Sequence, residues 1–419
     1  MKKYISKDTL AVLLIAVMAL SLVGCGFMYQ KEDVSRTSYT VNSDTSPHDV
    51  QENADTDINA QNSPSVSGQE EKIVLELESD LFTERDLTQT ADLSEAVTIT
   101  LTDGQTVNIT ESGVYVLTGT ASNAEVIVDA ADEDKVQLVL DSLDVTNDST
   151  PVIYVKNADK VFVTSASSES ALSVTGSFTS DGSTNTDAVI FSKDDLVLNG
   201  TGTVTISSVA NGVSCKDDLK VTGGTWNINC KDDALEANES ISVGGGILNI
   251  VTSKDGLHAE YDEDNTTGWI TVEGGTVNIT ASDDGIHATT TATVNGGEIS
   301  ITAAEGIEAT QVVINGGDIS ISAKDDGINA GQKSRSMSVG ITVTGGTIRI
   351  NMGQGDTDAV DSNGFLTVTG GTFDIYAQSP FDYDGKLTFT GGDIYVNGSR
   401  TNTITNQMMG GGMMGGRRS

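Results

Sequence analysis

Apolar residues recur in fixed columns around a repeated Gly-Gly pair in the second half of the chain. The pairs begin at positions 223, 245, 274, 296, 316, 345, 370 and 391. Three residues after the first glycine of each pair stand Trp226, Leu248, Val277, Ile299, Ile319, Ile348, Phe373 and Ile394. Five residues after it stand Ile228, Ile250, Ile279, Ile301, Ile321, Ile350, Ile375 and Val396. The positions two and four residues before it are apolar as well.

This alternation predicts two short strands around each turn, because successive side chains of a strand point to opposite faces. A third segment follows the pattern Asp-Gly-Ile/Leu-x-Ala, and its inward residue is Leu235, Leu257, Ile286, Ile307, Ile328 or Val360. Three strands and three turns make one triangular coil, and coils stacked about 4.8 Å apart pair each strand with its copies above and below. No segment shows a helical period. We therefore expect an all-β fold, a right-handed parallel β-helix.

The same alternation, less regular, runs through residues 73–199. We interpret this stretch as the first coils and an N-terminal cap of one domain that covers residues 73–400. Residues 25–72 are rich in Ser, Thr, Asp, Asn and Gln, which is typical of a disordered linker. Residues 401–419 contain a Met-Gly repetition and are expected to form a flexible tail, with copper binding or methionine redox chemistry as the open alternative.

The first 24 residues have the pattern of a signal peptide: three lysines, then a short apolar run that ends before Cys25. The run Leu22-Val23-Gly24-Cys25 resembles a bacterial lipobox, in which the cysteine carries the lipid. The sequence thus predicts a lipoprotein anchored to the outside of the cell membrane through Cys25. An ordinary secretory signal that happens to end in cysteine is the alternative. The two other cysteines, Cys215 and Cys230, fall in different columns, so no disulfide is expected between them.

The chain is strongly acidic, with 60 acidic and 23 basic residues and a net charge of −37. Such a charge repels nucleic acid and anionic lipid. It therefore excludes a nucleic-acid-binding role and leaves the lipid as the expected contact with the membrane. Bound divalent cations would account for the charge, and solubility is the alternative.

Several short motifs, in order, resemble a known family. They are residues 187–196 (DAVIFSKDDL), 199–203 (NGTGT), 216–219 (KDDL) and the repeated Asp-Asp-Gly-Ile. Together they resemble the bacterial cell-surface carbohydrate-binding β-helix family, typified by a clostridial cellulose- and polygalacturonate-binding protein, over roughly residues 75–400. The resemblance implies a pectate-lyase-like right-handed β-helix with bound calcium. It also implies binding of acidic plant polysaccharide without demonstrated cleavage.

One column of the repeat is acidic and is expected to face outward. Ten residues after the Gly pair, or in the equivalent slot, stand Asp233, Asp255, Asp284, Glu305, Asp326 and Asp358, and Asp232, Asp283 and Asp325 come one residue earlier. Two carboxylates about 4.8 Å apart repel by about 1 kcal/mol in water and about 3.5 kcal/mol at an effective dielectric of 20. Calcium suits such a column because it takes six to eight oxygen ligands in irregular geometry. Capping of turn amides by Asp side chains, without metal, is the alternative.

Lys254 lies in the sequence slot between Asp232 and Asp283 of the neighbouring coils. It is interpreted as a salt-bridge partner of the acidic column. The alternative is the catalytic base of a lyase, since pectate lyases abstract the proton α to a uronate carboxylate with Lys or Arg.

Candidate carbohydrate contacts come from the column three residues further on and from two insertions. The column contains Glu236, His258 and His287, and the two histidines are expected to stack, either as surface residues or as sugar ligands. Residues 261–267 are acidic, and residues 332–338 hold Lys333 and Arg335; the two insertions could wall a groove. Trp269 should face outward beside the first insertion and offer a stacking surface, whereas Trp226 belongs to the core.

The sequence thus predicts a lipid-anchored, monomeric carbohydrate-binding protein that captures acidic, pectin-like polysaccharide through calcium. The alternatives are a calcium-dependent polysaccharide lyase that uses Lys254 and a structural or adhesive surface protein.

Overall fold

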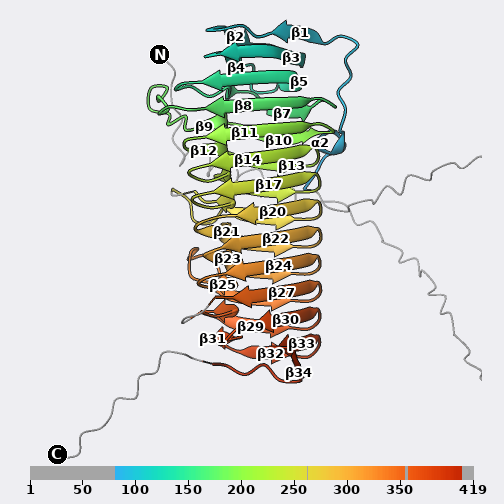
Figure 1. Cartoon of the computed structure of the whole chain (residues 1–419), viewed down its shortest axis with the longest axis vertical. Helices are drawn as coiled ribbons and strands as arrows, with labels where there is room; N and C mark the ends of the chain where they lie inside the picture. Colours follow the sequence, from blue (N-terminus) through green and yellow to red (C-terminus); the bar gives the residue numbers. More distant parts are fainter. Residues whose placement is uncertain (1–80, 262, 354–356, 408–419) are drawn as a thin grey trace, which may run out of the picture. The chain divides into compact units, whose positions relative to one another are not determined.

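The computed structural model of the chain describes residues 81–261, 263–353 and 357–407, which form a parallel β-helix (Figure 1). The predicted signal peptide, Cys25, the linker of residues 25–72 and the Met-Gly repetition of residues 408–419 lie outside the described residues. Within the described residues, no helix has both the length and the apolar character needed to cross a membrane.

Each coil contributes one strand to each of three faces, and successive coils pair in parallel and in register, as predicted. The first face contains β1 (Val97–Thr100), β7 (Lys160–Ser165), β10 (Asp195–Gly200), β13 (Asp218–Val221), β16 (Ser240–Val243), β19 (Trp269–Val272), β26 (Gly340–Val343), β29 (Phe365–Val368) and β32 (Leu387–Phe389). The second face contains β8 (Glu169–Val174), β11 (Thr203–Ser208), β14 (Thr225–Cys230), β17 (Ile247–Thr252), β20 (Thr276–Thr280), β22 (Glu298–Ala303), β24 (Asp318–Ala323), β27 (Thr347–Met352), β30 (Thr372–Tyr376) and β33 (Asp393–Val396). The third face contains β2 (Thr106–Ile109), β4 (Glu125–Asp129), β6 (Ile153–Asn157), β9 (Ala188–Ser192), β12 (Asn211–Cys215), β15 (Leu235–Ala237), β18 (Leu257–Ala259), β25 (Ile328–Ala330), β28 (Val360–Ser362) and β31 (Asp382–Tyr383).

Four longer strands turn a corner and belong to two faces. β3 (Gly113–Ser122) and β5 (Lys135–Asn147) join the first and second faces. β21 (Asp284–Val294) and β23 (Glu305–Ile314) join the third and first faces. The coils therefore follow one another in chain order from β1 to the last strands (Figure 1).

The core consists of the apolar columns that the repeat predicts. Side chains such as Leu248, Val277 and Ile299 lie directly above one another in register and are buried. Burying each side chain of this size stabilises the fold by roughly 1.5–3 kcal/mol relative to leaving it exposed. Trp226 is also buried, and its indole nitrogen donates to the carbonyl of Gly223 at 2.9 Å. The predicted core position of Trp226 is thus confirmed.

The Gly-Gly pairs form the turns between the first and second faces. The second glycine of each pair has a positive φ, for example 83° at Gly246. A side chain there would be strained in the left-handed region. Its Cβ would also lie 2.8 Å from the carbonyl carbon of Gly223 in the coil above. Conformation and stacking distance together require glycine. The two cysteines of the coils, Cys215 and Cys230, are buried free thiols.

The described residues ahead of β1 lie along the side of the coils. They include the short helix α2 (Glu84–Leu87), which lies beside the coils that contain β10 and β13 (Figure 1). Asp86 of α2 is fully buried, and its carboxylate lies 3.6 Å from both Lys160 Nζ and Lys220 Nζ. This ion-pair contact fixes the segment as a strap along the first face.

The predicted tail begins later than residue 401. Strand β34 (Ser399–Thr401) pairs antiparallel with β33, and Ile404 is buried. The backbone amide of Gln407 then donates to the carbonyl of Phe381 at 3.0 Å. Residues 401–407 therefore pack on the last coils, where Leu387, Phe389 and Val396 are only half-buried.

Candidate functional site on the third face

The middle residue of each short third-face strand points outward, because its two neighbours fill the core. Successive coils place these residues in register, so they form one continuous ladder, which we call the outward column. Its members from coil to coil are Ser214, Glu236, His258, His287, Glu308, Asn329, Asp361 and Asp382. Neighbouring members are held about 4.8 Å apart by the strand spacing. The third face thus presents a dense row of titratable groups.

The acidic column that precedes these strands does not face outward over its first three coils, contrary to the prediction. Asp233, Asp255 and Asp284 are only 3%, 4% and 6% exposed. The backbone amide of Asp255 donates to Asp233 Oδ1 at 3.1 Å, and that of Asp284 donates to Asp255 Oδ1 at 2.8 Å. The carboxylates of Asp233 and Asp255 therefore each cap the turn of the next coil. The same contact, at 3.2 Å, joins the amide of Asp358 to Asp326 Oδ1 in a later coil.

Residues one position earlier in the same turns are exposed. They are Asp232, Lys254, Asp283 and Asp325. Lys254 forms the predicted salt bridge to the acidic column, since its Nζ lies 2.9 Å from Asp233 Oδ2. Burial would lower the pKa of Lys254, but the hydrogen bond and charge of Asp233 outweigh burial and raise it. Lys254 is therefore held as a cation and is a poor proton acceptor at neutral pH.

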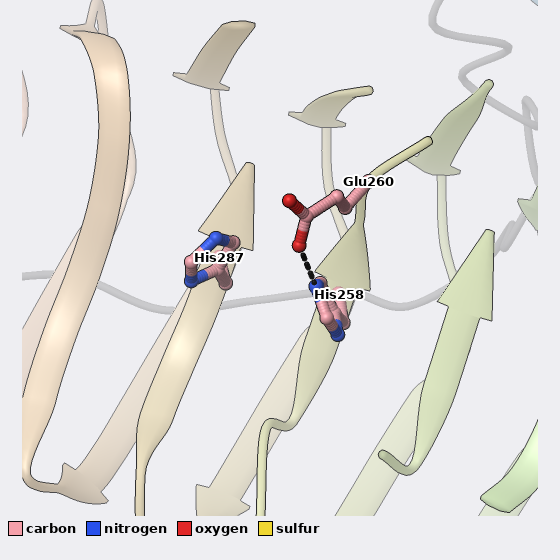
Figure 2. Close-up of side chains that lie close together, drawn as sticks. All are labelled: His258, Glu260 and His287. Atoms are coloured by element: carbon pink, nitrogen blue, oxygen red, sulfur yellow. Dashed lines mark hydrogen bonds and ion pairs between the residues drawn. The ribbon is translucent and has the colours of Figure 1, made fainter. Parts of the chain in front are cut away.

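His258 and His287 are neighbours in the ladder, as predicted, and their rings meet edge to face at 66° with centroids 4.9 Å apart. They are not simple surface residues, since their side chains are only 13% and 14% exposed. His258 Nδ1 lies 3.0 Å from Asp233 Oδ2, and its Nε2 lies 3.1 Å from Glu260 Oε2 (Figure 2). Burial would lower the pKa of His258, but these carboxylates raise it to about 9.

His287 is anchored in the same way one coil further on. Its Nδ1 lies 2.8 Å from Asp284 Oδ2 and 3.0 Å from Glu308 Oε2. Burial would lower the pKa of His287, but the two carboxylates raise it to about 10. Burial would raise the pKa of Glu308, but the hydrogen bonds and charges of His287 and Lys333 lower it to about 2. Both imidazoles are therefore cationic near pH 7.

The later coils of the acidic column have the opposite charge balance. Burial and neighbouring carboxylates raise the pKa of Glu305 to about 8, although Asn329 donates to its Oε2 at 2.9 Å. The same two causes raise the pKa of Asp326 to about 7 and that of Asp361 to about 6. Within the described part of the chain, no Lys, Arg or His forms an ion pair with these three groups. This half of the column would be stabilised by a bound cation.

The two insertions meet above the intervening coils. Ser334 of the second insertion donates its hydroxyl hydrogen to the carbonyl of Asn265 in the first at 2.5 Å. Lys333 Nζ lies 2.7 Å from Glu308 Oε1 and so ties the second insertion to the outward column. Arg335 of the second insertion is exposed. The insertions thus lie at one corner, where the groove wall is expected.

A hollow of about 430 Å³ opens beside the first insertion. Its lining is mostly charged or polar: Lys216, Asp233, Glu236, Asn238, Lys254, His258, Glu260, Tyr261 and Glu263. Glu236 is held in place by Asn211, Ser214 and Lys216. The lining combines cations with carboxylate and amide acceptors, which can bind both the carboxylate and the hydroxyls of an acidic sugar. Trp269 lies half-buried on β19, and is not among the described residues that line the hollow.

Sequence reasoning missed Glu260 and did not assign Glu308 to the site. Glu260 stands two residues after His258, and the period of two along a strand places both on one side. That spacing could have identified Glu260. Lys216 and Asn238 could not be found in this way, because their positions depend on how the corner turns.

Comparisons with known proteins give a family, a curated relative and a solved structure. The family of carbohydrate-binding domain-containing proteins matches residues 103–361 and 312–416. A curated carbohydrate-binding domain-containing protein of Acetivibrio thermocellus is 34% identical over 124 residues, which are 28% of this chain and 43% of that protein. The chain therefore spans less than half the length of this relative. A solved structure of a polysaccharide lyase-like protein from C. thermocellum, a gadolinium derivative, aligns with a TM-score of 0.31 at 23% identity, covering 72% of this chain and 94% of that one.

Proposed function

Since the chain belongs to the family of carbohydrate-binding domain-containing proteins, we propose that it captures an acidic, pectin-like polysaccharide on the third face of the β-helix. The observation that carries this proposal is the division of that face into a cationic part and a carboxylate part. A polyuronate offers one carboxylate per sugar, and each part of the face provides a different way to bind it.

The cationic part binds uronate carboxylates directly. Lys254 and His258 lie in the lining of the hollow, and both carry a positive charge near neutral pH. Hydrogen bonds to a carboxylate from charged donors are stronger than those from neutral donors. Glu236 accepts hydrogen bonds from the sugar hydroxyls, and the amide of Asn238 both donates and accepts them. Lys333 and Arg335 of the second insertion extend this part toward the later coils.

The carboxylate part binds calcium, which bridges protein and polysaccharide carboxylates. Glu305, Asp326 and Asp361 are half-buried, and neighbouring carboxylates raise their pKa values. A calcium ion relieves this repulsion and keeps ligand positions open for uronate oxygens and water. Asp325 and Asp358 belong to the same turns. In the first three coils, by contrast, Asp233, Asp255 and Asp284 already face Lys254 or a histidine, so we place no calcium there.

We further propose that the protein is a lipoprotein, held at the outer face of the cell membrane through Cys25. Lys254 supports binding rather than cleavage, because a general base for proton abstraction needs a pKa near the working pH. The direction of its pKa shift is upward, away from that range.

Retention of the full chain on immobilised polygalacturonate tests the proposal. We expect retention in calcium, weaker retention in excess chelator and none on a neutral glucan. Glu305→Gln with Asp326→Asn should remove the calcium-dependent part. The matched control is Glu298→Gln with Asp318→Asn, which changes the same residue types in the same two coils on the second face. Equal loss in both double variants would rule out a defined calcium site.

The same experiment separates binding from lyase activity. Lyase products carry a new double bond that absorbs in the ultraviolet, and we expect no rise in absorbance with calcium and polygalacturonate. We expect Lys254→Gln to weaken retention in chelator without abolishing it. A steady rise in absorbance that disappears in Lys254→Gln would identify an enzyme instead.

A further inference from the structure

We propose that His258, His287 and Glu260 form a binding site for a transition-metal ion of the zinc class, distinct from the calcium proposed for the later coils. The three side chains come from two adjacent coils and gather on one side of β18 and β21 (Figure 2). The site would hold its ion at the edge of the hollow, where the first insertion begins.

Both histidines are oriented as metal-ligating histidines are. Metal-bound imidazoles almost always donate their other N–H to a carboxylate or carbonyl, which fixes the ring orientation and raises its basicity. Here Asp233 holds His258 Nδ1 at 3.0 Å. Asp284 and Glu308 hold His287 Nδ1 at 2.8 and 3.0 Å. This leaves Nε2 of each ring, which in His258 faces Glu260, as the atom that would bind the ion.

The available donors point to one shared position. His258 Nε2 lies 3.1 Å from Glu260 Oε2, a contact that a bridging metal ion would replace. His287 Nε2 has no hydrogen-bond partner among the described residues. One ligand atom from each of the three residues lies within 4.8 Å of the others. Tetrahedral zinc has bonds of about 2.0–2.1 Å, which places its donors roughly 3.4 Å apart. The donors that lie farthest apart must therefore approach by up to about 1.4 Å, and Glu260 can move because its side chain is 45% exposed.

The chemistry of the donor set selects the ion. Imidazole nitrogen suits zinc, copper, iron and nickel, whereas calcium takes oxygen ligands. Two histidines and one carboxylate leave a fourth position for water or a ligand oxygen. The ion would tie together neighbouring third-face strands and the residue that opens the first insertion. It would thereby fix one wall of the hollow, which includes Tyr261 and Glu263.

Titration of the full chain with Zn²⁺ after removal of metal by chelator tests this proposal. Calorimetry should show one tight ion per chain that persists in excess Ca²⁺ with less than about a threefold change in affinity. His258→Gln and His287→Gln should each weaken Zn²⁺ binding by about 100-fold, and Glu260→Gln by at least about 10-fold. Co²⁺ bound at the site should give the strong visible absorption of a four-coordinate nitrogen and oxygen site.

Glu263→Gln is the matched control, because it removes the same charge from the same insertion and should leave Zn²⁺ affinity unchanged. The histidine variants also lose contacts to buried carboxylates. Glu260 is exposed, so Glu260→Gln keeps the test decisive even where a histidine variant fails to fold. Equal effects of Glu260→Gln and Glu263→Gln, or displacement of Zn²⁺ by Ca²⁺, would overturn the site and place the ion on the acidic column. Zn²⁺ affinity is measured without polysaccharide. Absence of retention on polygalacturonate would therefore count against the proposed function but not against the Zn²⁺ site.

Discussion

The buried aspartates of the acidic column use their two oxygens for different purposes. In Asp255, Oδ1 accepts the backbone amide of Asp284 at 2.8 Å, and Oδ2 faces His258 Nδ1 at 3.5 Å. One side chain therefore caps the next coil and also contributes charge to the third face. Turn capping and charge, which the sequence offered as alternatives, act at the same residue. They can be separated by substitutions that remove only one of them.

Asp255→Asn keeps the capping oxygen and removes the charge, whereas Asp255→Ala removes both. The amide of Asp284 is buried, and leaving it without a partner costs about 1–3 kcal/mol. We expect Asp255→Ala to lower the free energy of unfolding by that amount at pH 8. Asp255→Asn should leave it unchanged or raise it, because burial and nearby carboxylates raise the pKa of Asp255 to about 6. Denaturant unfolding measures both variants.

The control for this pair is Asp232→Ala, since Asp232 is exposed one residue before Asp233. A change within about 0.5 kcal/mol is expected there. Equal destabilisation by Asp255→Asn and Asp255→Ala would show that charge, and not capping, holds this turn.

At the scale of the strands, the third face changes character along its length. From β15 to β23 its acids are matched by Lys254, His258, His287 and Lys333. From β23 to β28 carboxylates face one another, and the pKa values of Glu305 and Asp326 reach about 8 and about 7. Stability without calcium should therefore depend on pH in a defined direction.

We expect the melting temperature in chelator to fall as the pH rises from 5 to 8. Glu305, Asp326 and Asp361 have folded pKa values above the unfolded values of about 4. In this pH window the folded state therefore binds more protons than the unfolded state, and the free energy of unfolding falls as the pH rises. His258 and His287 act in the same direction from about pH 6.5 upward, because their folded pKa values are about 9 and about 10.

The double variant Glu305→Gln with Asp326→Asn should flatten this pH profile, and calcium should flatten that of the unchanged chain. A melting temperature that rises between pH 5 and pH 8 in chelator would contradict the assignment of these carboxyls as the ones that repel.

The strap formed by α2 is a second element whose stability depends on one residue. Asp86 is fully buried between Lys160 of β7 and Lys220 of β13. Breaking a buried ion pair by removing one partner costs about 3–5 kcal/mol. Asp86→Ala should therefore lower the free energy of unfolding by about 3 kcal/mol, the lower end of this range. The lower end is expected because Lys160 still forms an ion pair with Asp195 at 3.2 Å. Glu84→Gln, on the exposed side of α2, is the control. Loss of protection in residues 81–89 by hydrogen exchange should accompany Asp86→Ala only.

These elements also show how far the sequence could predict the structure. The coils follow from columns such as Leu248, Val277 and Ile299, because a period of two and a repeat are local signals. The strap was not predictable, because Asp86 contacts Lys160 and Lys220, which lie 74 and 134 residues further along the chain. For the site, the outward column was predicted, but the Asp-Gly signal alone could not tell whether Asp255 caps a turn or faces solvent. That depends on the position of the next coil.

For the whole molecule, a net charge of −37 makes electrostatic repulsion a general cost of folding. Any added salt screens part of it, since the Debye length is about 10 Å at 0.1 M ionic strength. An increase in stability on adding calcium therefore does not by itself demonstrate a specific binding site. A specifically bound ion adds a further stabilisation that grows with the ratio of its concentration to the dissociation constant, and reaches about 2.7 kcal/mol at a ratio of 100.

We therefore expect calcium to raise the melting temperature more than sodium chloride does at the same ionic strength. The coils unfold as one array, because each buries its apolar columns only against its neighbours, so a local ion should shift a single transition. Glu305→Gln with Asp326→Asn should reduce the response to calcium to that of sodium. Glu298→Gln with Asp318→Asn, which removes the same charge from the second face, should preserve the calcium advantage. Equal responses to the two salts in the unchanged chain would mean that the acidic face is only screened, and that its carboxylates bind no specific ion.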